Sequence, residues 1–293
     1  MAAAIELRGV SFAYYEKTVL RGIDLTVRQG EFVALMGPIA CGKTTLLTVM
    51  NGLIPHVVKG SFGGTAKLVG NDTRTTPLRE LARHAGFLFQ EPDSQIFSLS
   101  VQDEVEFALR NFGVKEAERK KLVEQTLAEL SLSNLADADP RELSQGQKQK
   151  VALASVLAYG PEVLLLDEPA ASLDHYSSEE IYDVVKGLNR KGKTVVVVEH
   201  DTELIVDRAD RLVVMNEGRL VADGKFEEVF GKKTTGLGIK EPCFSRIAHE
   251  LGVQVRSERE FVEHLKGHGA GAASKSESRG AKGTRKSPWS DAT

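Results

Sequence analysis

The sequence predicts an α/β fold whose main sheet is largely parallel and is covered by helices. Short apolar runs of strand length occur at Glu31–Met36, Gly86–Gln90, Val163–Asp167 and Thr194–Glu199. Segments with helical spacing separate these runs, and strands that alternate with helices assemble into a layered, mainly parallel sheet. In addition, a glycine-containing turn joins the first of these strands to the helical pattern of Thr44–Asn51.

Both ends of this region carry further strand patterns. They lie at Ile5–Val10, Ile23–Val27, Arg211–Asn216 and Arg219–Asp223. We expect Gly22 and Gly30 to interrupt the first strands, because glycine weakens the interior of a strand. The glycine-rich stretch Gly60–Gly70 predicts a hairpin.

A helix-rich stretch from about 91 to 160 interrupts the alternation. Helical spacing runs over Val101–Leu130, and a polar loop at Pro140–Gln149 leads into the apolar helix Val151–Tyr159. We interpret this stretch as an inserted helical subdomain.

The chain divides into a main domain at 1–231, a C-terminal helical extension at 232–266 and a tail at 267–293. Apolar residues recur at helical spacing in Glu241–Leu265. From Gly267 onward Gly, Ala, Ser, Lys and Arg dominate, and such a segment cannot bury a core. We therefore expect a disordered tail, which is either solvated or in contact with anionic lipid through its basic residues.

Charge and cysteine content narrow the class of protein. A net charge of −3 over 293 residues disfavours a dedicated nucleic-acid binder, which usually has a basic surplus. Two distant cysteines, Cys41 and Cys243, form no disulfide framework, which favours a reducing, cytoplasmic setting. No apolar run approaches the roughly 20 residues that cross a bilayer, and we see no secretory signal.

The turn after Glu31–Met36 carries a phosphate-binding motif. Residues 37–44 fit the pattern G-x-x-x-x-G-K-[ST], in which backbone N–H groups and a helix N-terminus converge on a polyphosphate. Lys43 supplies a cation for the β- and γ-phosphates, and the Thr44 hydroxyl can ligate Mg²⁺. The predicted nucleotide-binding residues are Gly37, Pro38, Ile39, Ala40, Cys41, Gly42, Lys43, Thr44 and Thr45. The predicted ligands are ATP and Mg²⁺.

Two residues make this loop atypical. Ala40 stands where many such loops have another glycine, and we expect it to be tolerated if position 40 is right-handed. Cys41 stands where serine is common, so we expect thiol modification of the nucleotide-free protein to block ATP.

Two carboxylates end the strand Val163–Asp167. Asp167 reaches the carboxyl edge of the sheet beside the phosphate loop, where it can hold a hydrated Mg²⁺. Glu168 follows and can orient or deprotonate the attacking water. With the phosphate loop, this pair predicts nucleotide hydrolysis.

Between these motifs, Leu143-Ser144-Gln145-Gly146-Gln147 resembles the LSGGQ signature of ABC-type ATPases. In that family the signature grips the γ-phosphate of nucleotide bound by the other subunit. The resemblance therefore implies that Ser144, Gly146 and Gln147 bind ATP in trans, within a dimer that closes on two ATP molecules. Gln145 departs from the usual glycine.

Other positions match the family in order. Gln90 resembles the Q-loop glutamine, with catalytic and metal-binding roles beside Thr44 and Asp167. His200 resembles the switch histidine, and Asp174 resembles the D-loop aspartate that crosses the dimer interface. Tyr14 matches the aromatic residue that stacks on adenine, with Tyr15 as the rival. The implied catalytic residues are Glu168, His200, Gln90 and Lys43.

The resemblance covers residues 4 to 230 and implies a P-loop, ABC-type core with an N-terminal antiparallel β part. More narrowly, Phe89–Phe97 and Val101–Phe107 are similar to the energy-coupling factor group, which powers vitamin and cobalt or nickel uptake. Gln95 lies in the segment that faces the coupling protein in that group. The implied partners are a membrane coupling protein, a substrate-binding component and a second ATPase in a homodimer or heterodimer. The implied location is peripheral, at the cytoplasmic face of the cell membrane.

The phosphate loop also fits two alternative functions. A non-transport ABC ATPase acting on DNA or the ribosome would carry a long coiled-coil insertion or two cassettes, and the sequence has no sustained heptads and no repeat of either motif. A metabolite kinase would use the same phosphate loop but would leave Leu143–Gln147 and His200 unexplained.

Overall fold

The computed structural model describes residues 2–230, 234, 236–253 and 260–266. The chain forms two compact units, Met1–Glu241 and a second unit that begins at Pro242. The second unit contains helix α10 (Cys243–Glu250) and a helical stretch at 260–266. The predicted tail at 267–293 lies outside the described residues. Among the described residues, no helix has the length and apolarity that crossing a membrane requires.

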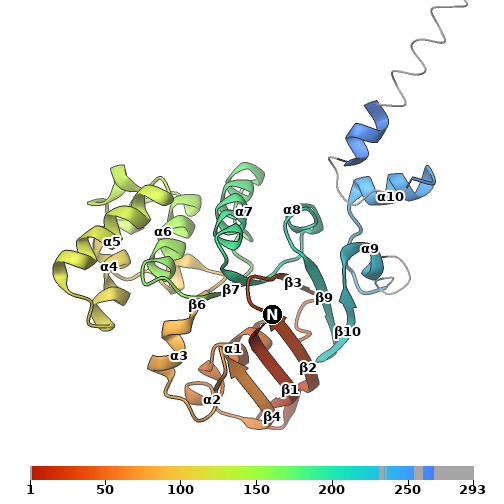
Figure 1. Ribbon diagram of the computed structural model, residues 1–293, viewed down its shortest axis with the longest axis horizontal. Coiled ribbons are helices and arrows are strands. Elements are labelled where there is room, and N and C mark those ends of the chain that lie inside the picture. Colours follow the sequence, from red (N-terminus) through yellow and green to blue (C-terminus); the bar gives the residue numbers. More distant parts are fainter. Residues whose placement is uncertain (1, 231–233, 235, 254–259, 267–293) are drawn as a thin grey trace, which may run out of the picture. The chain divides into compact units, whose positions relative to one another are not determined.

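A six-stranded sheet forms the centre of the first unit, in the order β10-β9-β3-β8-β7-β6 (Figure 1). All neighbouring pairs from β9 to β6 are parallel, and β10 is antiparallel to β9. The strands are β3 (Phe32–Met36), β6 (Ala85–Leu88), β7 (Val163–Asp167), β8 (Thr194–Val198), β9 (Arg211–Asn216) and β10 (Arg219–Gly224). The predicted mainly parallel sheet is confirmed.

A second, four-stranded sheet is antiparallel and has the order β2-β1-β4-β5. Its strands are β1 (Ala3–Tyr14), β2 (Lys17–Arg28), β4 (Ser61–Leu68) and β5 (Asn71–Asp72). The prediction that Gly22 breaks a strand is wrong, because β2 runs through it. Gly9 and Gly22 have φ of 57° and 67° and lie near register shifts, so these glycines form irregularities within long strands.

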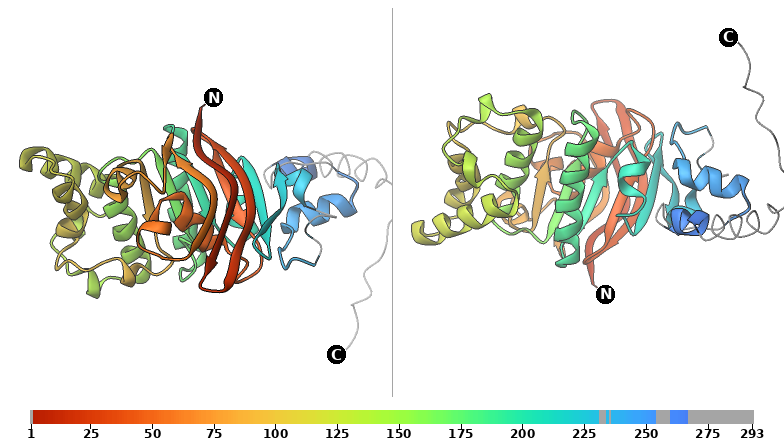
Figure 2. Two further views of the ribbon diagram at one scale, coloured as in Figure 1. Left: turned by 90° about the horizontal axis from the view of Figure 1, so that it is seen from below. Right: turned by 90° about the horizontal axis from the view of Figure 1, so that it is seen from above.

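The helices pack around these sheets, with α6 over β6 and with α4 and α5 beyond the β6 edge (Figure 1 and Figure 2). Their bounds are α1 (Lys43–Met50), α2 (Leu53–His56), α3 (Leu78–His84), α4 (Val101–Asn111), α5 (Glu116–Glu129), α6 (Gln145–Leu157), α7 (His175–Arg190), α8 (Thr202–Ile205) and α9 (Phe226–Val229). Short 3₁₀ turns are η1 (Pro92–Ser94), η2 (Ser133–Leu135) and η3 (Pro140–Glu142). The predicted loop at Pro140–Gln149 is wrong in its second half, because Ser144 caps a helix that begins at Gln145.

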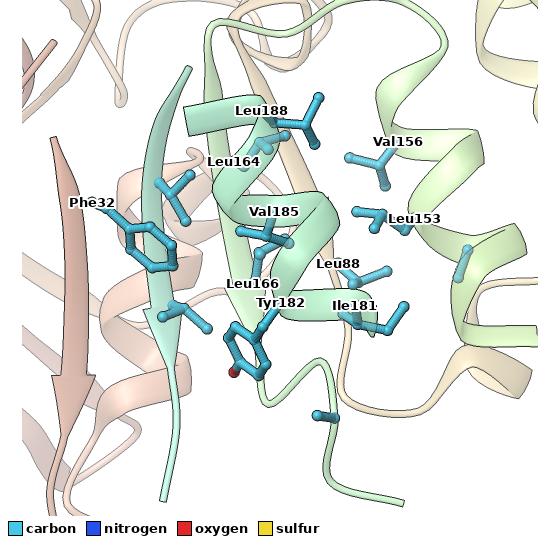
Figure 3. Packing of buried hydrophobic residues seen from close by; sticks show 14 of the residues in the cluster. Phe32, Leu88, Leu153, Val156, Leu164, Leu166, Ile181, Tyr182, Val185 and Leu188 are labelled. Atoms are coloured by element: carbon cyan, nitrogen blue, oxygen red, sulfur yellow. The ribbon is translucent and has the colours of Figure 1, made fainter. Parts of the chain in front are cut away.

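The central sheet separates two cores because successive side chains on a strand face opposite sides. On β8, Val195 and Val197 join the core that contains α6 and α7, whereas Val196 and Val198 join the core that contains α1. Figure 3 shows the first of these cores, with side chains of α6 and α7 directed toward each other and toward the sheet. This alternation decides which side chains reach the site at the strand ends.

Candidate functional site

The site lies at the carboxyl ends of β3, β7 and β8. These strands are neighbours, with β8 paired in parallel to both others. The phosphate loop follows β3, Glu168 follows the last residue of β7, and His200 lies two residues beyond β8. A single sheet edge therefore collects groups that are far apart in the sequence.

Lys43 forms hydrogen bonds within the phosphate loop. The Lys43 ammonium donates to the carbonyls of Gly37 at 2.9 Å and Pro38 at 3.0 Å. Gly37 has φ of 149°, and a Cβ there would lie 2.2 Å from the carbonyl oxygen of Met215, so only glycine fits. Gly42 has φ of 109° and precedes α1, so the first N–H groups of α1 lie at the loop.

Ala40 has a left-handed backbone, with φ of 62°. The condition under which we expected alanine to be tolerated, a right-handed position 40, is therefore not met. An L-residue in this region brings Cβ close to the following carbonyl oxygen, at a cost of roughly 1–2 kcal/mol. The residue is exposed, so the strain comes from the backbone and not from crowding.

Cys41 is buried, with 6% of its surface exposed, and it also lines a small cavity beside the loop. Burial raises the pKa of the Cys41 thiol, although the nearby Lys43 charge lowers it. A thiolate is the reactive form, so reagents would attack this side chain slowly while the loop keeps this conformation. The predicted block of ATP by thiol modification therefore requires the loop to open.

Asp167 is 4% exposed, and its Oδ1 atom has no hydrogen-bond partner among the described residues. Burial raises the pKa of this carboxyl, while a hydrogen bond with the Thr44 side chain lowers it. A buried carboxylate oxygen without a partner, beside a hydroxyl, is a donor set that suits Mg²⁺. The two predicted ligands are thus together, and the site fits the metal.

Glu168 has φ of 48°, a rare conformation for a residue other than glycine. Continued strand geometry would turn its side chain away from Asp167, toward the α7 side of the sheet. Instead its carboxylate accepts a 2.8 Å hydrogen bond from the amide of Gln90 and lies 2.9 Å from Nε2 of His200. Three of the four implied catalytic side chains, those of Gln90, Glu168 and His200, therefore form one cluster, at the cost of local backbone strain.

A cavity of about 570 Å³ covers this cluster and the phosphate loop. Its lining comprises Tyr14, Lys17, Val19, Ile39, Ala40, Gly42, Lys43, Thr44, Thr45, Gln90, Glu168 and His200. Tyr14 is fixed by an edge contact with Phe12 and by a 3.3 Å hydrogen bond with Thr45, whereas Tyr15 is 97% exposed at the turn. Lys17 and Val19 were missed, although their position on the strand after Tyr14 could have indicated them.

The signature residues do not line this cavity. Ser144 and Gln147 form a capping box at the start of α6, with N–H to side-chain distances of 3.0 and 3.3 Å. A Cβ on Gly146 would lie 3.3 Å from Oγ of Ser177 on α7. Asp174 caps α7 by accepting from the N–H of Ser177 at 3.0 Å, and it also lies outside the cavity.

Gln145 joins the signature helix to the segment after Gln90. The Lys148 ammonium lies 2.8 Å from the Asp93 carboxylate on η1. Hydrogen bonds from Lys148 and from the Gln145 side chain hold the pKa of Asp93 below its usual range. The departure at position 145 thus gives η1 a contact that glycine could not provide.

Comparison with known proteins agrees with this geometry. A model of the ABC transporter family matches residues 20–171. Proteins named as ABC transporter ATP-binding proteins are similar to this chain in Pyrococcus abyssi (41% identity, covering 84% of this chain and 90% of the relative) and Pyrococcus horikoshii (40% identity, covering 89% and 96%).

Two solved structures share the fold. The first is cbiO1 of Clostridium perfringens, described as part of the ABC transporter complex cbiONQ, with a TM-score of 0.72 and 30% identity over 86% of this chain and all of that one. The second is the ATP-binding cassette MJ0796, a dimer in a post-hydrolysis state bound to ADP and Pi, with a TM-score of 0.66 and 30% identity over 75% and 98%. The chain therefore belongs to the ABC transporter family, as an ATP-binding and ATP-hydrolysing subunit.

Proposed function

We propose that this ATPase powers energy-coupling-factor-type import of a metal ion or a vitamin, at the cytoplasmic face of the cell membrane. The observation that carries the proposal is the likeness to cbiO1, a protein described as part of the transporter complex cbiONQ. The proposed partners are a membrane coupling protein, a substrate-binding component and a second ATPase, either a copy of this chain or a sister chain.

In this proposal each residue of the cavity has a separate role in ATP hydrolysis. Glu168 accepts the proton of the attacking water, and its carboxylate is held from two sides by Gln90 and His200. Lys43 leaves the loop carbonyls for phosphate oxygens, and the Tyr14 ring packs on adenine. Bound Mg²⁺ would neutralise charge on the β- and γ-phosphates. Thr44, Gln90 and Asp167 are the residues that would hold it.

The second half of the proposed site comes from the partner ATPase. Ser144, Gly146 and Gln147 lie outside the cavity of their own chain, at the N-terminus of an α-helix of 13 residues. Free N–H groups at such an end bind phosphate. A two-fold pair places this end of one chain over the phosphate loop of the other. Asp174 contributes at the same interface.

The proposed docking surface for the coupling protein is apolar. Four exposed apolar side chains lie around η1 and α4: Phe89, Phe97, Leu99 and Phe107, which are 41%, 62%, 74% and 41% exposed. The Phe97 and Phe107 rings are in edge contact at 4.6 Å. The buried Glu104 carboxylate accepts the N–H groups of Phe97 and Ser98 at 3.1 and 2.8 Å, so the loop is held in place.

Gln95 stabilises the same region, because its side-chain oxygen accepts the N–H of Phe89 at 3.2 Å. Exposed apolar patches on a fixed backbone favour a protein partner over solvent. This supports assigning the segment after Gln90 to the membrane partner.

Affinity purification from detergent-solubilised membranes tests the proposal. We expect the tagged wild-type chain to retain a membrane protein, and Phe97→Glu to lose it because a charge enters the apolar patch. Val57→Glu is the matched control, because Val57 is 61% exposed but lies elsewhere. Thermal melting of both variants checks that they are folded.

The solute is identified by uptake of labelled cobalt, nickel and vitamins into proteoliposomes that contain the purified complex. Import that requires ATP supports the proposal. Recovery of the wild-type chain with ribosomes or DNA and without a membrane protein would contradict it, as would ATPase activity that only DNA or ribosomes stimulate.

A further inference from the structure

The alternation of side chains along β8 places the next two residues, Glu199 and His200, on opposite faces of the sheet. Val195 and Val197 of β8 belong to the core against α7, whereas Val196 and Val198 belong to the core against α1. Continuing this period of two, Glu199 faces α7 and His200 faces the phosphate loop. Glu199 is 6% exposed, so its carboxylate is among the few buried ones.

The buried carboxylate has a specific partner on α7. The Tyr182 hydroxyl donates to Oε2 of Glu199 at 2.6 Å, and Tyr182 is fully buried. Figure 3 shows the Tyr182 ring at the end of the aliphatic cluster, with its oxygen directed away from the labelled side chains. Burial raises the pKa of Glu199, while the hydrogen bonds from Tyr182 and from the backbone of Asp201 and His200 lower it.

The other oxygen of Glu199 holds the turn that carries His200. Oε1 accepts the N–H of Asp201 at 3.2 Å. Asp201 then caps α8 by accepting the N–H of Glu203 at 3.0 Å. His200 is therefore fixed between a buried carboxylate and a capped helix, and its ring meets Glu168 at 2.9 Å.

We infer that Glu199 and Tyr182 are positioning residues that hold the backbone of His200, so that the His200 ring meets the Glu168 carboxylate. Neither side chain lines the cavity, so they act through His200 and not on the nucleotide. The inference rests on the proposed role of His200. It also connects the site to α7, whose first residue follows Asp174 of the proposed dimer interface.

The test measures kcat, KM and nucleotide affinity of the full chain with single and paired substitutions. We expect Glu199→Ala to lower kcat on the order of tenfold to a hundredfold, as misplacing a catalytic group does, with KM within about twofold. Glu199→Gln should restore most of kcat, because an amide oxygen still accepts the N–H of Asp201 and its N–H₂ can donate to Tyr182. Tyr182→Phe should lower kcat by about tenfold or less.

Tyr159→Phe is the matched control, because it also removes a tyrosine hydroxyl that donates to a distant acceptor, the carbonyl of Ala85 at 3.2 Å. This variant should keep the wild-type kcat. If Glu199→Ala does not fold, Tyr182→Phe carries the test.

Double substitutions separate positioning from general destabilisation. In a His200→Ala background, Glu199→Ala or Tyr182→Phe should cause no further loss of kcat, because residues that act as a unit are non-additive. Equal losses in both backgrounds would overturn the inference while leaving the role of His200 intact. A wild-type kcat in His200→Ala itself would overturn the proposed role of His200 and this inference with it.

Discussion

The phosphate-loop half and the signature half of this chain differ in how their polar groups are satisfied. In the first, Lys43 and Asp167 are buried at 6% and 4% exposure, and the functional side chains contact one another. In the second, Ser144 and Gln147 cap each other's N–H groups at a helix end that does not line the cavity.

This difference shows that the function of the phosphate-loop half can be explained from one chain, whereas that of the signature half cannot. The strand-end half has its donors and acceptors arranged around a cavity, and it contains the left-handed backbones of Ala40 and Glu168. The signature half has a capped helix end that does not line the cavity of its own chain. Substitutions in the two halves should therefore have different effects on turnover, nucleotide affinity and stability.

The largest effect is expected at Glu168. Glu168→Gln removes the base but keeps the size of the side chain, so we expect turnover to fall by about 10²–10⁴. Nucleotide binding should persist, because the phosphate loop is untouched. Phosphate release and nucleotide affinity are the two measurements. Unchanged phosphate release would contradict the assignment of Glu168 as the base.

A smaller effect is expected at Ser144. Ser144→Asp keeps a good helix cap but places a negative charge where the partner's γ-phosphate is proposed to bind, so we expect a loss of turnover of roughly tenfold or more. Ser144→Asn is the matched control, because it keeps the cap without the charge. Nucleotide affinity of the isolated monomer should be unchanged in both variants.

A mixture of the two variants with low turnover would sharpen the comparison. In an equal mixture of Glu168→Gln and Ser144→Asp chains, half of the dimers are mixed and one site in each is intact, so about a quarter of wild-type turnover should return. No recovery of turnover in the mixture would argue against sites shared between two copies of this chain.

Much of the fold could be predicted from periodicity alone. The buried parallel strands are continuous apolar runs, and the structure contains them within a residue or two of the predicted bounds. The antiparallel strands were predicted too short, because Gly9 and Gly22 permit bulges without ending the strand. Sequence patterns show that a glycine is present but not whether the partner strand continues past it.

Less of the site could be predicted. The motifs indicated Gln90, Glu168 and His200, but their contact depends on the left-handed backbone at Glu168, which no pattern indicates. Glu199 looked like the end of an apolar run, although its carboxylate is buried against Tyr182. Such pairs arise from tertiary packing between segments that are 17 residues apart.

The smallest effect is expected at Ala40, where the phosphate-loop half is strained. Ala40→Gly should relieve roughly 1 kcal/mol or more of backbone strain, against about 0.5–1 kcal/mol for the freedom that glycine gains on unfolding. We therefore expect a change of unfolding free energy between zero and about 1 kcal/mol of stabilisation.

Ala128→Gly is the matched control, because Ala128 is exposed in α5 and glycine there should destabilise by about 0.5–1 kcal/mol. Urea unfolding of the nucleotide-free chain measures both variants. Equal destabilisation by the two substitutions would mean that position 40 is right-handed in solution, and the strain in this half would then lie at Glu168 and not in the loop.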